Sequence, residues 1–131
     1  MSRKRTILVI EDQEQNLYLM QYMLEAHGYE VVLATEGHAG IRAAKDGHPD
    51  LILLDIQLPT ISGYDVARQI RADGRLASVP IVAVTSFAMP GDREEALASG
   101  CTGYIEKPID PTRFIDQVEG FVTDRATGER E

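Results

Sequence analysis

Residues 51–59 read LILLDIQLP, an apolar run of leucine and isoleucine that ends on an aspartate. The run has no alternation of apolar and polar positions, which is typical of a strand covered on both faces in a parallel sheet. Similar runs lie at residues 6–10, 31–34 and 81–84, and a weaker one lies at 103–105. The sequence therefore predicts five strands, the first four of them covered on both faces.

The segments between these runs have the spacing of amphipathic helices. Leu17, Met20 and Leu24 recur at intervals of three and four, and Gly28 follows as a stop signal. Further helices are predicted over residues 37–45, from residue 62 or 63 onward, over 91–98 and over 114–122. This regular alternation predicts right-handed βαβ crossovers and a three-layer, doubly wound α/β sandwich.

Length and charge limit the functions that are open to the chain. Its 131 residues correspond to one domain, predicted to span residues 1–122, with a polar tail at 123–131 that frays. With 13 basic and 21 acidic residues the formal net charge is −8, which argues against nucleic-acid and membrane partners. No apolar run reaches the ~18 residues of a membrane helix. The single cysteine, Cys101, is expected to be a buried, small apolar residue, and the protein to be cytoplasmic.

Polar side chains follow the predicted strands at their carboxyl ends. Glu11 and Asp12 come after the first strand, Asp55 after the third, Thr85 after the fourth and Lys107 after the fifth. In a doubly wound sheet of order 2-1-3-4-5, strands one and three are neighbours where the winding reverses, and ligands bind there. We therefore expect the carboxylates of Asp12 and Asp55 to converge, with Thr85 and Lys107 arriving from the other side.

These residue types indicate phosphoryl chemistry with a divalent cation. Three crowded carboxylates raise one another's pKa unless a cation lies among them, and an all-oxygen donor set favours Mg²⁺. With the cation present, Asp55 stays ionised and can attack phosphorus, while Lys107 and the Thr85 hydroxyl position and neutralise the phosphoryl group. Dinucleotide-binding, P-loop, HExxH and GxSxG motifs are absent from the sequence.

Further motifs extend this pattern along the whole chain. They are Glu11-Asp12 after ILVI, Asp55 in LILLDIQLP, Ser62-Gly63-Tyr64, Thr85 in VAVTS, Tyr104, and Lys107-Pro108. In this set and order the chain resembles the receiver domain of two-component response regulators, which implies a flavodoxin-like fold with strand order 2-1-3-4-5. The VTSFAM segment at residues 84–89 is similar to stand-alone single-domain regulators of the DivK type and to receivers of hybrid kinases.

The resemblance implies a role for each acidic residue. Asp55 is the expected acceptor of a phosphoryl group from a sensor histidine kinase or a histidine phosphotransfer protein. Asp12, Asp55 and the main-chain carbonyl of Gln57 are the expected Mg²⁺ ligands, and Glu11 completes the pocket through a water molecule.

The resemblance also implies a conformational switch. Lys107 is expected to bridge to the phosphoryl group, and the Lys107-Pro108 peptide bond is expected to be cis. Thr85 moves toward the phosphate and Tyr104 turns inward. The face formed by the fourth helix, fifth strand and fifth helix then changes for a downstream protein.

Other functions remain alternatives at this point. Because only residues 123–131 follow the last predicted helix, the expected output is a protein contact or a phosphorelay. The protein is expected to be a monomer or a weak dimer. It is not expected to be an enzyme, beyond assisting its own phosphotransfer and dephosphorylation. A phosphorylation-independent interaction module on the same fold is the alternative, although no acceptor, acidic pair or lysine is lost. A phosphohydrolase would need an aspartate where Gln57 stands. Plainer roles are Asp12 as a helix cap, Thr85 as a turn hydroxyl and Tyr104 as a packing residue.

Overall fold

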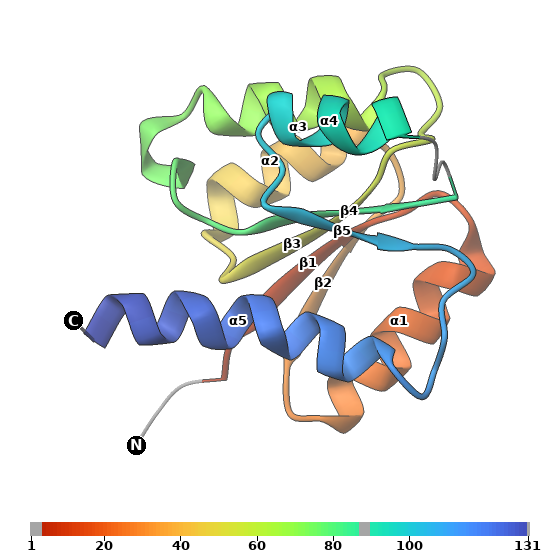
Figure 1. Cartoon of the computed structure of the whole chain (residues 1–131), viewed down its shortest axis with the longest axis vertical. Coiled ribbons are helices and arrows are strands. Elements are labelled where there is room, and N and C mark those ends of the chain that lie inside the picture. The colour runs from red at the N-terminus through yellow and green to blue at the C-terminus, as the bar shows by residue number, and fades with distance from the viewer. Residues whose placement is uncertain (1–3, 87–89, 131) are drawn as a thin grey trace.

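Five strands and five α-helices alternate in the computed structural model, which describes residues 4–86 and 90–130. The strands are β1 (Thr6–Ile10), β2 (Glu30–Ala34), β3 (Leu51–Asp55), β4 (Ile81–Thr85) and β5 (Gly103–Glu106). The helices are α1 (Glu14–Ala26), α2 (Gly37–Gly47), α3 (Gly63–Arg71), α4 (Pro90–Ala98) and α5 (Phe114–Arg130), with a short 3₁₀ helix η1 (Gly74–Leu76). Figure 1 shows three layers, with α1 and α5 on one face of the sheet and α2, α3 and α4 on the other.

The sheet has the strand order β2-β1-β3-β4-β5, and every neighbouring pair is parallel. The predicted doubly wound α/β fold and its strand order are therefore confirmed. Ile10 at the end of β1 lies opposite Leu54 of β3, and Asp55 lies opposite Val84 of β4. The carboxyl ends of β1, β3, β4 and β5 thus meet at one edge of the sheet.

Alternate residues of the central strands supply two separate cores. In β1, Ile7 and Val9 pack with residues of α1 and α5, whereas Leu8 and Ile10 pack with residues of α2, α3 and α4. All four side chains are at most 1% exposed, which explains the lack of alternation in the sequence. The prediction that β2 is also covered on both faces is wrong, because β2 is an edge strand and its Val32 is 40% exposed.

Helix ends agree with most of the stop and start signals in the sequence. α1 ends just before Gly28, which has φ +89°, and α3 begins directly after Ser62, whose Oγ accepts a hydrogen bond from the Asp65 amide at 3.3 Å. The helix η1 was not predicted. The α5 backbone is helical as far as Arg130, beyond residue 122, where the apolar stripe of the predicted helix ends. Cys101 is buried, as expected.

Arg71 connects α3 to the loops that precede β4 and β5. Its guanidinium donates to the main-chain carbonyls of Gly100, Leu76 and Val79 at 2.9, 2.9 and 2.6 Å. We expect Arg71→Lys to lower the free energy of unfolding by about 2–3 kcal/mol, because one ammonium group cannot reproduce this fork of donors. Arg68→Lys, at an exposed surface ion pair, should change it by less than about 1 kcal/mol. Urea unfolding measures both variants, and equal stabilities would contradict the prediction.

Candidate functional site

The acidic residues of the site follow the ends of two neighbouring strands. Glu11 and Asp12 come directly after β1, and the Glu11 amide donates to the Ala34 carbonyl at 3.0 Å, which extends the pairing with β2. Asp55 is the last residue of β3. The Glu11 side chain is fully buried and Asp55 is 2% exposed, whereas Asp12 is exposed. The site therefore has two carboxylates in its floor and one at its opening to solvent.

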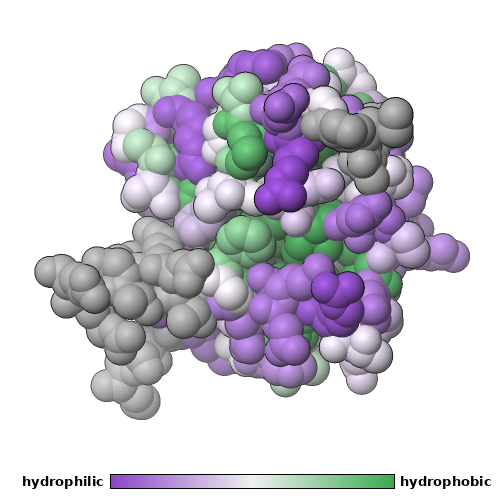
Figure 2. Space-filling view, in the orientation of Figure 1, coloured by the Kyte–Doolittle hydropathy of each residue, from purple (hydrophilic) through white to green (hydrophobic). Residues whose placement is uncertain are grey.

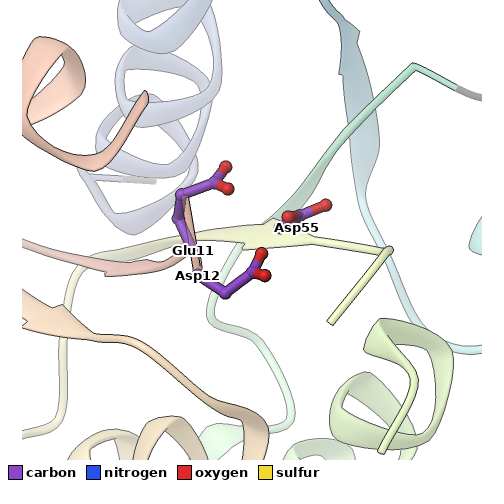
Figure 3. Close-up of side chains that lie close together, drawn as sticks. All are labelled: Glu11, Asp12 and Asp55. Carbon is purple, nitrogen blue, oxygen red and sulfur yellow. The ribbon is translucent and has the colours of Figure 1, made fainter. Parts of the chain in front are cut away.

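The three carboxylates lie close enough to share one cation. Oxygens of Glu11, Asp12 and Asp55 all lie within 4.8 Å of one another, and Figure 3 shows the three side chains gathered at the strand ends. The structure thus brings Asp12 and Asp55 together, as the strand order predicted. Among the described residues, buried Glu11 Oε1 accepts no well-aligned hydrogen bond, and the Lys107 ammonium lies 3.2 Å from it. Three crowded carboxylates form an all-oxygen donor set that fits a hard cation such as Mg²⁺.

Lys107 reaches into this cluster from the end of β5. Its Nζ lies 3.2 Å from Glu11 Oε1 and 3.4 Å from Asp55 Oδ2, and its side chain is 12% exposed. The sequence placed Lys107 near Asp55, but it did not predict the ion pair with Glu11. A buried carboxylate is strongly destabilised without a counter-charge, so the lysine is held between the two acids.

Burial and mutual repulsion change the acidity of the cluster. Burial, with the nearby Asp55 charge as the second cause, raises the pKa of Glu11 to about 7. The pKa of Asp12 is also raised, by partial burial and then by Asp55. The folded chain therefore favours a proton, or another cation, in this site.

The raised pKa of Glu11 predicts that the metal-free protein loses stability as the pH rises. Because this pKa is about 7 in the folded protein against a usual value of 4.5, the folded state binds the proton more tightly than the unfolded chain does. The resulting stabilisation is complete below pH 4.5 and is lost as the pH rises through 7. In EDTA, we expect the free energy of unfolding to fall by a few kcal/mol between about pH 5 and pH 8, and by much less in Glu11→Gln. Urea unfolding at each pH measures the free energy of unfolding. The same pH dependence in wild type and Glu11→Gln would contradict the prediction.

The loops after β3, β4 and β5 are connected around Asp55. The Gln57 amide donates to Asp55 Oδ1 at 2.9 Å, and Ser86 Oγ donates to Gln57 Oε1 at 2.8 Å. Thr85 is 4% exposed, and its carbonyl accepts a hydrogen bond from the Lys107 amide at 2.8 Å. The Asp55 carboxylate is thus oriented from the main chain on one side and faces a lysine on the other.

Tyr104 lies on β5, apart from the acidic cluster. The Arg93 guanidinium lies 5.7 Å from the centre of its ring, a contact that the sequence did not predict because nothing in it marks which α4 residue faces β5. Both residues line a groove of about 750 Å³, together with Lys107 and Ile109. Most residues that line this groove are charged or polar, and Figure 2 shows an apolar band between the α4 and α5 layers. The Lys107-Pro108 peptide bond is cis, as predicted.

Comparison with known proteins supplies the family. The family model described as the response regulator receiver domain matches residues 7–119. The chain belongs to this family. Receiver domains are signalling proteins of two-component systems and interact with histidine kinases and with downstream proteins. This receiver domain has no helix, within residues 4–86 and 90–130, that is long and apolar enough to cross a membrane.

Relatives of this receiver domain include single-domain regulators. The polar-differentiation response regulator DivK of Brucella ovis is 41% identical over 92% of this chain and 98% of its own length, and DivK of Brucella anthropi is 40% identical over the same shares. These matches confirm the DivK-like resemblance.

Solved structures agree with the fold and include a metal-bound example. The receiver domain of the sensor histidine kinase PA1611 from Pseudomonas aeruginosa is 34% identical, with a TM-score of 0.85 over 92% of this chain and 99% of that one. It holds a magnesium ion coordinated in its active-site cleft. Vibrio cholerae chemotaxis regulator CheY4 is 24% identical, with a TM-score of 0.87 over 91% of this chain and 99% of its own, and shares the fold.

Proposed function

We propose that this receiver domain is a DivK-like, single-domain regulator that accepts a phosphoryl group on Asp55 from a histidine kinase or a histidine phosphotransfer protein. The observation that carries the proposal is the position of Lys107 Nζ, 3.4 Å from the buried Asp55 carboxylate. A lysine held there can neutralise the oxygens of an incoming phosphoryl group. A phosphorylation-independent module would have no need of this buried set of charges.

The proposed cofactor is Mg²⁺, held by Asp12, Asp55 and the main-chain carbonyl of Gln57, with Glu11 acting through water. The cluster of three carboxylates and the magnesium ion in the Pseudomonas relative both support this assignment. Bound Mg²⁺ would supply positive charge to the phosphoryl oxygens during transfer.

In the proposed transfer step, a carboxylate oxygen of Asp55 forms a bond to phosphorus as the bond between phosphorus and the donor's histidine nitrogen breaks. The nitrogen keeps the electron pair and takes up a proton. Lys107 then exchanges its contact with Asp55 for the phosphoryl oxygens, and the Thr85 hydroxyl donates to another of them. Tyr104 would follow this change and alter the groove between α4, β5 and α5, which is the proposed contact surface for a downstream protein.

The test uses a small-molecule donor in place of the unknown kinase. The wild-type chain is incubated with phosphoramidate or acetyl phosphate, in Mg²⁺ or in EDTA, and its intact mass is measured. We expect one added phosphoryl group per chain in Mg²⁺ and none in EDTA. No uptake in Mg²⁺ would favour the phosphorylation-independent module instead.

A further inference from the structure

The groove beside Tyr104 runs along an edge strand of the sheet. β5 is the last strand in the sheet order, and Figure 1 shows it between α4 in one helix layer and α5 in the other. With a volume of about 750 Å³, the groove has room for several side chains of another protein. The charges that line it decide which side chains fit there.

Two arginines line this groove from different elements. Arg93 lies on α4, with its guanidinium 5.7 Å from the centre of the Tyr104 ring, and Arg113 lies in the turn before α5. Both are exposed, and neither forms an ion pair with another residue that the structure describes. A guanidinium held against a ring loses little further freedom on binding, and its N–H groups can bind a carboxylate in a fork. Both arginines are therefore available to acidic groups of a partner.

The acidic residues of α4 lie away from the groove. Asp92, Glu94 and Glu95 belong to the described part of α4, and none of them lines the groove. Burial raises the pKa of Tyr64 in α3, and the charges of Asp92 and Glu95 add to this rise, so these two carboxylates lie on the α3 side of α4. The helix therefore presents a positive charge to β5 and negative charges to α3.

Two further charged groups of the groove already have partners. The Lys107 ammonium pairs with the acidic cluster, and Asp110 Oδ1 accepts hydrogen bonds from the Thr112 amide and hydroxyl at 3.0 and 2.7 Å. Glu106 is the remaining acid among the described lining residues. In a chain with a formal net charge of −8, the groove thus sets two arginines against one carboxylate without such a partner.

We propose that the groove between α4, β5 and α5 binds an acidic segment of the downstream protein, whose carboxylates pair with Arg93 and Arg113. This inference rests on the proposed function, which makes the groove the contact surface. Complementary charge speeds encounter and fixes register, so an acidic segment is preferred over a neutral or basic one. A second copy of this chain would oppose the two arginines with the same two arginines if it used the same face, which makes it the less favourable occupant.

The experiment selects peptides without assuming their charge. A phage-displayed library of short random peptides is selected on the wild-type chain loaded with Mg²⁺ and beryllofluoride, a mimic of the phosphoryl group, and separately on the unloaded chain. We expect the peptides recovered from the loaded chain to be enriched in aspartate and glutamate. The peptide recovered most often is then labelled, and its affinity for each variant is measured by fluorescence anisotropy.

Charge reversal identifies the residues that bind the peptide. The double variant Arg93→Glu with Arg113→Glu should weaken binding at least about tenfold, because two attractive pairs become repulsive. Arg42→Glu with Arg68→Glu changes the net charge equally, at exposed arginines of α2 and α3 outside the groove, and should stay within about twofold of wild type. Circular dichroism checks the fold of both variants.

The possible results separate this inference from the proposed function. Neutral or basic peptides, acidic peptides that bind the Arg93 and Arg113 double variant as tightly as wild type, or no recovered peptide would overturn the inference. A dimer of the loaded chain in gel filtration that this variant loses would assign the face to a second copy and overturn it as well. Failure of the wild-type chain to take up a phosphoryl group from phosphoramidate would overturn the proposed function, whereas selection on the unloaded chain would still report the charge preference of the groove.

Discussion

Asp55→Asn is expected to abolish phosphoryl uptake, from one group per chain to none. The amide oxygen of asparagine is a poor nucleophile, and the change also removes the negative charge that lies 3.4 Å from Lys107 Nζ. The fold should be retained, because an asparagine oxygen can still accept the hydrogen bond from the Gln57 amide. Intact mass after incubation with phosphoramidate and Mg²⁺ measures the uptake, and circular dichroism checks the fold.

The matched control for this variant is Asp50→Asn. Asp50 is 7% exposed and its Oδ2 accepts a hydrogen bond from the Thr6 amide, but it precedes β3 and so lies at the opposite end of the sheet from Asp55. We expect this control to take up one phosphoryl group, like wild type. A labelled Asp55→Asn chain would show that another residue is the acceptor.

Gly63→Ala is expected to lower the free energy of unfolding by about 2–4 kcal/mol. A Cβ atom at Gly63 would lie 2.5 Å from the Asp55 carbonyl oxygen and 2.6 Å from Ile56 Cα, both of them backbone atoms that cannot rotate away. Either α3 or the segment after Asp55 must shift to admit the methyl group. Because that segment directly follows Asp55, the proposed acceptor, the rate of phosphoryl uptake should fall together with stability.

Gly120→Ala is expected to stabilise the protein, because a methyl group can be added at this position without a clash. Gly120 lies within α5, and nothing lies within 4 Å of a Cβ atom added there. Alanine should raise the free energy of unfolding by about 0.5–1 kcal/mol, because it loses less conformational entropy in a helix than glycine does. Urea unfolding compares the two variants, and a Gly63→Ala chain as stable as Gly120→Ala would show that the α3 contact is loose.

The sheet could be predicted because its central strands are buried on both faces. In β1, β3 and β4 this burial requires apolar residues at successive positions, which is why each strand has a continuous apolar run in the sequence. β2 has a similar run but lies at the edge, where Val32 is exposed. Whether a strand is central depends on the order of all five, and no local pattern contains that information.

Positions in the site could be predicted better than contacts. The order of the strands brings Asp12, Asp55 and Lys107 to one edge, whatever their rotamers. The ion pair between Lys107 and Glu11 depends on which buried charges lack another partner in the unphosphorylated protein. The resemblance to receiver domains had instead assigned Lys107 to the phosphoryl group and Glu11 to a water molecule. The Ser86–Gln57 hydrogen bond depends on loop geometry, which leaves no periodic signature.

The burial of Cys101 gives the protein a built-in reporter. This thiol is the single cysteine of the chain, it is 5% exposed within the core beneath α2, α3 and α4, and burial raises its pKa. A thiol in that state reacts with a maleimide only when the surrounding core opens. The rate of alkylation of Cys101 therefore measures how often the core opens on this side of the sheet. If phosphorylation changed that opening rate, the alkylation rate would change with it, and no engineered cysteine would be needed.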